Sequence, residues 1–134
     1  MSAGYSGAPL AKKLGFKPGE PLWAAGMPAS VKAELDAQAQ PRYLARPTKA
    51  LATAHIFHVS AAKLEADLEA LREKLAPDGM VWVSWPKKAA KVATDITEDT
   101  IRKLALPMGY VDVKVCAVDE TWSGLKLVIR KALR

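Results

Sequence analysis

The chain has 134 residues, of which half are hydrophobic and a quarter are charged. This composition is typical of one globular domain and excludes a disordered chain. No apolar run approaches the roughly 20 residues that a membrane helix needs, and the start, Met1 to Leu10, lacks the apolar stretch of a signal peptide. The single cysteine, Cys116, excludes an internal disulfide and indicates a reducing, cytoplasmic compartment.

The net charge of +6 is spread along the chain. Residues 1–50 carry seven basic and three acidic side chains, whereas residues 51–134 carry thirteen and eleven. Such a field attracts anions weakly, and no run of five basic residues concentrates it. We therefore expect no dedicated nucleic-acid binding, because dedicated binders usually gather their charge on one face.

The first part of the chain predicts short elements separated by proline and glycine. Gly15 is typical of a helix end, Pro41 stops a helix, and Pro47 limits a strand. The expected elements are an N-terminal arm or short helix within 1–16 (a flexible start at Tyr5 to Gly7, a helical turn over 9–14), a turn over 17–20, a first strand over 22–25, a helix from Pro28 or Ser30 to about Gln40, and a short edge strand over 42–46.

The second part predicts alternating strands and helices. Ser60 and Thr97 are suitable N-caps for two helices, and leucines at helical spacing mark the first of them. The expected elements are a buried strand over 51–59, a helix with inward Leu64, Leu68, Leu71 and Leu75, a turn at Pro77-Asp78-Gly79, a buried strand over 80–84 that Trp85-Pro86 ends, a helix with inward Ile101, Leu104 and Met108, a strand over 111–117, a hairpin loop over 119–124 and a last strand over 125–130.

The last two strands show strict alternation. Val111, Val113, Val115 and Ala117 alternate with polar residues, which predicts that these four form the better-buried face of their strand. The two strands are joined by only about six residues, so they must run antiparallel. The earlier strands alternate with helices, which favours a mostly parallel sheet with helices on both faces. The sequence thus predicts an α/β fold: a single Rossmann-like domain over 1–134 with a C-terminal antiparallel hairpin.

This order of elements resembles the second half of the class I S-adenosylmethionine-dependent methyltransferases. The segment Leu-Ala-Pro-Asp-Gly-Met-Val-Trp-Val at 75–83 is similar to their passage from helix to apolar strand. The whole chain is also similar to a small bacterial family known only as a domain of unknown function, through three stretches: SGAPLAKKLG at 6–15, WPKK at 85–88 and VCAVDETWSGL at 115–125. The resemblance implies a truncated methyltransferase fold and no assigned activity.

The resemblance also implies where a cofactor would bind. Class I methyltransferases place a glycine-rich loop after the first strand and an acidic residue after the second. Here the first strand is followed by a single glycine, Gly26, and the second ends in Arg46-Pro47 without a carboxylate. We therefore expect S-adenosylmethionine not to bind in the usual mode, which leaves the cofactor unknown.

Polar and aromatic residues follow the strands that should end at one edge of the sheet. Ligands of open α/β sheets bind beyond the carboxyl ends of the strands. Lysines beside flat aromatic rings suit an anion with a planar ring, such as a nucleotide. The candidate ligand-binding residues are His58, Ser60, Ser84, Trp85, Lys87, Lys88, Asp119, Glu120, Trp122 and Ser123.

Structural roles compete for several of these residues. Lys87 and Lys88 could pair with Asp119 and Glu120 as solvated loop charges, and Asp119 could bond the loop backbone. Trp85 and Trp122 suit packing as well as ligand contact. Three further residues are expected to be structural: Trp82, His55 and Cys116. Two distant histidines and one cysteine make no zinc site, so no metal is expected.

The first functional hypothesis is a non-catalytic, methyltransferase-like module. It would bind a small anionic ligand or a protein partner, including a second copy of the chain, at the carboxyl edge of the sheet. One alternative is an S-adenosylmethionine-dependent transferase with an atypical cofactor loop, which uses a lysine and a carboxylate as acid and base. The other alternative is weak nucleic-acid binding through the spread basic surface.

Overall fold

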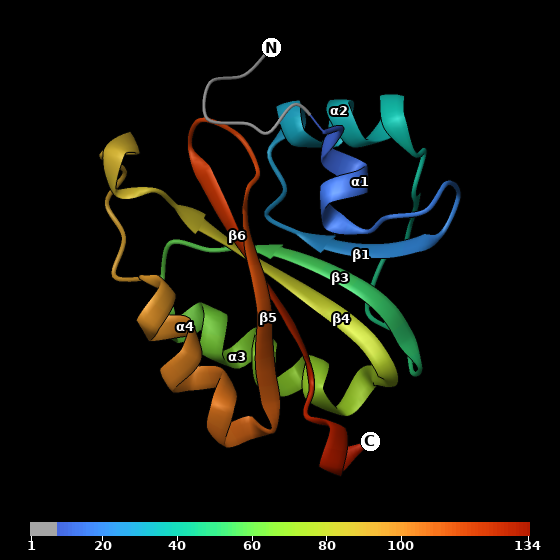
Figure 1. The fold of residues 1–134 in the computed structure, drawn as a ribbon, viewed down its shortest axis with the longest axis vertical. Coiled ribbons are helices and arrows are strands. Elements are labelled where there is room, and N and C mark those ends of the chain that lie inside the picture. Colours follow the sequence, from blue (N-terminus) through green and yellow to red (C-terminus); the bar gives the residue numbers. More distant parts are fainter. Residues whose placement is uncertain (1–7) are drawn as a thin grey trace.

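A computed structural model describes residues 8–134, and a six-stranded sheet runs through its middle (Figure 1). The spatial order of the strands is β2-β1-β3-β4-β6-β5. The first four strands are parallel, and β6 lies antiparallel between β4 and β5. The strands are β1 Pro21–Ala25, β2 Arg42–Tyr43, β3 Leu51–Phe57, β4 Leu75–Pro86, β5 Tyr110–Ala117 and β6 Trp122–Ile129.

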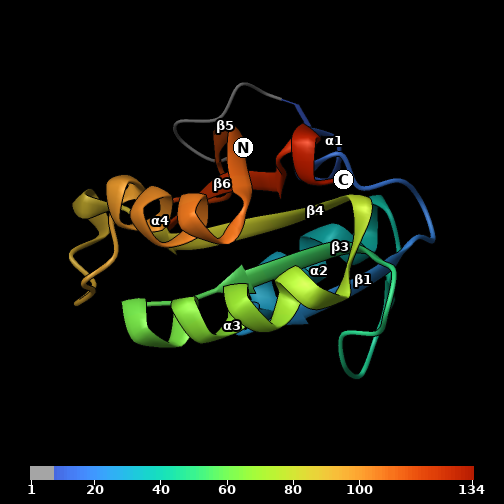
Figure 2. The ribbon, with the colours of Figure 1, turned by 90° about the horizontal axis from the view of Figure 1, so that it is seen from below.

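Helices cover both faces of the sheet, as Figures 1 and 2 show. Helices α1 (Leu10–Leu14) and α2 (Ala29–Gln38) lie on one face, and α3 (Ala61–Lys74) and α4 (Glu98–Ala105) lie on the other. Three short 3-10 turns complete the described chain: η1 Lys88–Ala90, η2 Leu106–Met108 and η3 Lys131–Leu133. The predicted Rossmann-like α/β class with a closing antiparallel hairpin is therefore confirmed. The start predicted to be flexible, Tyr5 to Gly7, lies outside the described residues.

Each face of the sheet has its own apolar core. The core beneath α3 and α4 contains Leu64, Leu68 and Leu71, which are fully buried. Each of these leucines stabilises the fold by roughly 1.5–3 kcal/mol through the apolar area that it removes from water. The core beneath α1 and α2 is centred on Trp82, whose indole N–H donates to the carbonyl of Leu14 at 2.8 Å. The short α1 is thereby fixed to the middle of the sheet.

Strand β4 is longer at both ends than the sequence indicated. Leu75 is the first residue of β4 and not the last of the helical stripe, and Pro77-Asp78-Gly79 belongs to the strand and not to a turn. Leu75 pairs with Leu51 of β3, and a side chain at Gly79 would come within 2.7 Å of the Leu51 carbonyl. The glycine is needed there for close strand approach, not for a reversal of the chain.

The carboxyl end of β4 also extends past the predicted stop. Trp85 pairs with Ser123 and Pro86 pairs with Trp122, so the strand does not end at Ser84. By contrast, the edge strand β2 covers only two residues, where 42–46 had been predicted. Met108, predicted on an inward helical face, lies in η2 and is half-buried.

The predicted burial of alternate residues in β5 is wrong. Val113 and Val115 are 52% and 47% exposed. The pairing of β5 with β6 shifts register between Asp112 and Lys114, which leaves Val113 without a partner in the ladder. Strand β5 is also the edge of the sheet, where no further strand covers its outer side. Within residues 8–134, no helix is both long and apolar enough to cross a membrane.

Candidate functional site

The loop after β4 and the tip of the β5–β6 hairpin meet at the carboxyl edge of the sheet. The backbone N–H of Lys87 donates to the carbonyl of Thr121 at 2.7 Å, next to the Pro86–Trp122 strand pair. The backbone N–H of His58 donates to the Ser84 carbonyl at 3.1 Å, which joins the end of β3 to the same edge. The expected meeting of these segments at one rim is therefore present.

The hairpin tip divides this rim into two hollows of different charge. The first, which we call the β4–α4 cleft, has a volume of about 530 Å³ and is lined by Trp85, Pro86, Lys87, Lys88, Val92, Thr94, Ile96, Thr97, Glu98 and Ser123. The second is an acidic hollow of about 380 Å³ beside α2, lined by Ser30, Val31, Glu34, Asp119, Glu120 and Thr121. Within the described chain, neither lysine forms an ion pair with Asp119 or Glu120, so the expected pairing is wrong.

Two cations and one aromatic ring give the β4–α4 cleft its chemistry. Trp85 is 8% exposed and packs into the α3–α4 core, so it forms a rigid wall. Lys87 is half-buried and Lys88 is exposed. The only carboxylate on the lining, Glu98, is already paired with Arg102. The two lysines therefore dominate the field inside the cleft.

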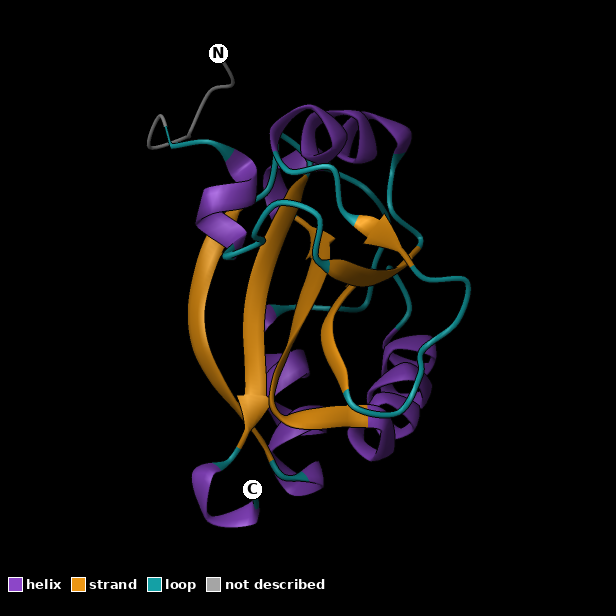
Figure 3. Ribbon diagram, turned by 90° about the vertical axis from the view of Figure 1, so that its right-hand side faces the viewer, coloured by secondary structure: helices purple, strands orange, loops and turns teal. Residues whose placement is uncertain are grey.

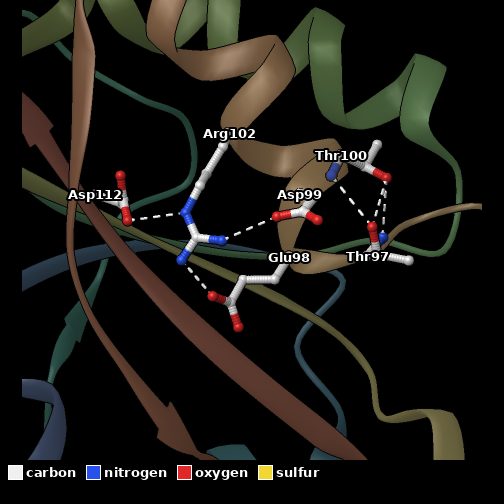
Figure 4. A network of polar contacts seen from close by, with 6 residues as sticks. All are labelled: Thr97, Glu98, Asp99, Thr100, Arg102 and Asp112. Carbon is white, nitrogen blue, oxygen red and sulfur yellow. Dashed lines mark hydrogen bonds and ion pairs between the residues drawn. The ribbon is translucent and has the colours of Figure 1, made fainter.

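The first turn of α4, which forms one wall of the cleft, is held by a polar network (Figure 4). The Thr97 hydroxyl accepts the backbone N–H of Thr100 at 3.2 Å and caps the helix. The Arg102 guanidinium donates to Asp112 at 3.0 Å, to Asp99 at 3.2 Å and to Glu98. The hydrogen bond to Asp112, followed by that to Glu98, raises the pKa of Arg102 above its ordinary value. This network also ties α4 to β5.

The loop from 87 to 97 is fastened at its far end. The Thr94 hydroxyl donates to the Val59 carbonyl at 2.8 Å, and the Asp95 carboxylate accepts the backbone N–H of Ala61, the first residue of α3, at 2.7 Å. Ile96 is buried in the core directly after them. Thr94 and Asp95 are not among the residues singled out from the sequence, yet they hold the loop to α3 and to the residue before its cap. These partners lie more than 30 residues apart in the sequence, so only the three-dimensional structure reveals the contact.

The side chain of Ser84 is buried in the sheet and lines neither hollow, which corrects its candidate ligand role. It is fully buried, and its hydroxyl lies 2.7 Å from Nε2 of the buried His55. The His55 ring stacks on Phe57 with centroids 4.3 Å apart, and its Nδ1 has no hydrogen-bond partner. Burial lowers the pKa of His55 to about 3. This serine–histidine pair is sealed inside the sheet, as the structural reading of His55 predicted.

His58 and Ser60 both serve α3. Nε2 of His58 lies 2.6 Å from a carboxylate oxygen of Asp67, on the second turn of that helix. The Ser60 hydroxyl accepts the backbone N–H of Lys63 at 3.4 Å and caps the helix, as its position predicted. Neither residue lines the two hollows described above.

The remaining candidates shape the hairpin tip. The Asp119 carboxylate accepts the backbone N–H groups of Thr121 and Trp122 at 2.8 and 2.7 Å, which is the turn chemistry that the sequence indicated. The Trp122 ring meets Phe57 edge-on at 5.2 Å and packs against the α1–α2 core. Glu120 is exposed, and Ser123 faces the β4–α4 cleft. Of the ten candidates, four line that cleft: Trp85, Lys87, Lys88 and Ser123.

The loop after β1, where the resemblance to methyltransferases implies a cofactor loop, contains a single glycine, Gly26. Gly26 has a φ of +68°, and a side chain there would lie 2.7 Å from the Phe57 carbonyl. The glycine thus allows the chain to approach β3 closely, while Gly26 itself stays exposed. The residues after β2 are Leu44, Ala45 and Arg46, so no carboxylate is present there to hold ribose hydroxyls. Among residues 8–134, no group of three histidine, cysteine or acidic side chains could hold a metal ion.

Comparison with known proteins finds its matches among solved structures. No family model and no curated protein sequence matches the chain. A S-adenosylmethionine-dependent methyltransferase from Aquifex aeolicus superposes with a TM-score of 0.63 at 12% identity, over 90% of this chain and 87% of that one. The magnesium protoporphyrin IX methyltransferase from Synechocystis with bound S-adenosylmethionine gives 0.57 at 15% identity, over 90% and 74%.

A third similar structure is a tRNA methyltransferase. The tRNA methyltransferase TrmK of B. subtilis gives a TM-score of 0.62 at 12% identity, over 99% of this chain and 68% of that one. Identities this low establish the fold and not the activity. The chain therefore has the Rossmann-like fold of the S-adenosylmethionine-dependent methyltransferases.

Proposed function

We propose that this protein is a methyltransferase-fold binding module. It takes a small anionic ligand with a planar ring, such as a nucleotide, in the β4–α4 cleft and transfers no methyl group. The observation that carries the proposal is the pair Lys87 and Lys88 beside Trp85, in a hollow whose only carboxylate is held by Arg102. The volume of about 530 Å³ lies within the range of small-molecule sites.

The residue types of the cleft suit a phosphorylated, ring-bearing ligand. The lysines supply mobile charges for a phosphate, while Trp85, Pro86 and Val92 supply an apolar wall for a ring. The Thr97–Thr100 cap and the Arg102 network fix the opposite wall, so little ordering is required when a ligand binds.

The absence of methyl transfer is inferred from the groups that the chain offers. The buried histidine is bonded to Ser84 away from solvent, and the second histidine is bonded to Asp67. Gly26 packs against Phe57, where the fold family places its cofactor loop. Neither histidine therefore faces the cleft, and the one carboxylate on its lining, Glu98, is paired with Arg102.

The proposal is tested by titration with AMP, ADP and GDP while the melting temperature and tryptophan fluorescence are followed. A ligand present at a hundred times its dissociation constant is expected to stabilise the protein by about 2.7 kcal/mol. The double variant Lys87→Gln, Lys88→Gln is expected to bind at least about tenfold more weakly, because charged hydrogen bonds contribute about 1.5–3 kcal/mol each. Lys91→Gln is the control, since Lys91 lies in the same loop but does not line the cleft. No stabilisation by any nucleotide, or equal losses in both variants, would reject the proposal.

The second candidate is a S-adenosylmethionine-dependent transferase with an atypical cofactor mode. It is favoured by the fold, since the neighbours named above are described as methyltransferases and one of them holds bound S-adenosylmethionine. Isothermal calorimetry separates the two candidates. Binding of S-adenosylmethionine that survives Lys87→Gln, Lys88→Gln would support the transferase, whereas no heat at millimolar cofactor would dismiss it.

A further inference from the structure

The charges of this chain are distributed unevenly along the sequence. No acidic residue occurs between Gln40 and Ser60, although this stretch contains Arg42, Arg46 and Lys49. It forms β2, the loop from β2 to β3 and all of β3. One edge of the sheet is therefore built from a segment whose only formal charges are positive.

Helix α1 and the turn that precedes β1 bring two more lysines, Lys12 and Lys17, to the same edge. The backbone N–H of Gly19 donates to the Ala39 carbonyl at 2.8 Å, and that of Arg42 donates to the Glu20 carbonyl at 2.9 Å. Lys17 lines one small cavity with Pro41 and a second hollow with Lys12. Figure 3 faces this edge, where the loop from β2 to β3 runs along the outside of the sheet.

These cations form what we call the β2-edge basic surface: Lys12, Lys17, Arg42, Arg46 and Lys49. All five are exposed, and within residues 8–134 none of them takes part in an ion pair. Glu20 is the acidic residue of the adjoining turn, and it too is exposed. Asp36 beside Tyr43 of β2 is paired with Lys32, and Glu20 lines a small cavity with Lys17, so the five cations exceed the carboxylates of this edge.

The surface suits a phosphate backbone better than a lipid headgroup layer. Proteins that lie on membranes insert apolar side chains beside their basic ones. The large exposed hydrophobic residues of the described chain all lie elsewhere: Val59, Val92, Leu106, Val113, Val115 and Leu133. Tyr43 and Trp23 are half-buried and offer no free platform for the stacking that single strands need. Exposed cations without apolar side chains beside them suit the phosphate backbone of a duplex.

From this distribution we infer that the β2-edge basic surface binds the backbone of double-stranded nucleic acid, without sequence preference. Cations and prolines also keep an edge strand from pairing with another chain. That role concerns β2 and its flanking residues, whereas Lys12 and Lys17 come from a separate helix and turn. The inference does not depend on the nucleotide site, because none of these five residues lines the β4–α4 cleft.

The test is fluorescence anisotropy with a labelled 20-base-pair DNA duplex of arbitrary sequence. Binding is expected with a dissociation constant of about 10⁻⁶ to 10⁻⁴ M near physiological salt. With five phosphate contacts the slope of log K against log salt should be about −4.5, and in the triple variant Arg42→Gln, Arg46→Gln, Lys49→Gln it should fall to about −1.8.

A matched variant controls for net charge alone. Arg130→Gln, Lys131→Gln, Arg134→Gln removes the same residue types from another exposed part of the chain and is expected to keep the wild-type slope. No anisotropy change up to about 100 μM protein in low salt, or the same slope in both triple variants, would overturn the inference. Sedimentation with phosphatidylserine vesicles, without duplex binding, would assign the surface to membranes and overturn it as well.

Discussion

His55 has one hydrogen-bonding contact in an otherwise aromatic setting. Its ring lies between Phe16 and Phe57, and only Nε2 has a partner, the Ser84 hydroxyl at 2.7 Å. A charged imidazole would lose its hydration there without any carboxylate in compensation. Burial therefore lowers the pKa of His55 to about 3, so that the folded protein holds the ring neutral above that pH.

This residue makes stability depend on pH in the acid range. In the unfolded chain the histidine takes up a proton below about pH 6.5, whereas the folded protein does not until about pH 3. The free energy of unfolding should therefore fall by about 1.4 kcal/mol per pH unit below pH 6.5, or about 2 kcal/mol at pH 5. Urea unfolding at pH 7 and pH 5 measures this loss.

The matched variant is His55→Gln, which keeps a polar group beside Ser84 but does not titrate. It should be less stable than wild type at pH 7, yet lose about 2 kcal/mol less between pH 7 and pH 5. Parallel losses in the two proteins would show that other groups carry the pH dependence and that His55 is not held neutral.

At the scale of elements, the junction of β1 and β3 depends on Gly26. Both Gly26 and Gly19 have positive φ, at +68° and +73°. Only Gly26 is crowded, since a side chain there would lie 2.7 Å from a backbone carbonyl of β3, whereas nothing lies within 4 Å of one at Gly19. The two glycines thus separate the cost of backbone strain from the cost of steric overlap.

We expect Gly19→Ala to destabilise by about 1 kcal/mol through its left-handed backbone alone. Gly26→Ala should cost about 1–3 kcal/mol more, because the Phe57 carbonyl must move and β1 must part from β3. Denaturant midpoints of the two variants and wild type measure the difference. Equal costs would mean that the end of β1 yields easily and that close contact with the Phe57 carbonyl adds nothing to the cost.

Element prediction from sequence succeeded where local signals were sufficient. Helix α3 has its cap at Ser60 and its leucines at helical spacing, and both are read within 15 residues. The early start of β4 could not be read in this way, because it depends on pairing with Leu51, far away in sequence. The exposure of Val113 had the same cause: the irregular register with β6 is invisible in the alternation of β5 itself.

At the scale of the whole molecule, the sequence predicted which segments share the carboxyl rim. It could not predict on which side of the hairpin tip each residue falls. Lys87 and Lys88 line the β4–α4 cleft, while Asp119 and Glu120 line the hollow beside α2. Strand alternation places a residue on one face only when the exact register is known. For this reason only four of the ten candidate residues line one cleft.

The insertion of β6 between β4 and β5 has a consequence for how the molecule assembles. Strand β5 has no neighbour other than β6, and β4 has β3 on one side only until β6 arrives. During synthesis, until the residues from Trp122 onward are available, β4 is unpaired on one side and β5 has no neighbouring strand. The parallel strands β1 to β4 can pair before the chain is complete. The sheet is complete only when β6, the last strand in sequence, pairs with both β4 and β5.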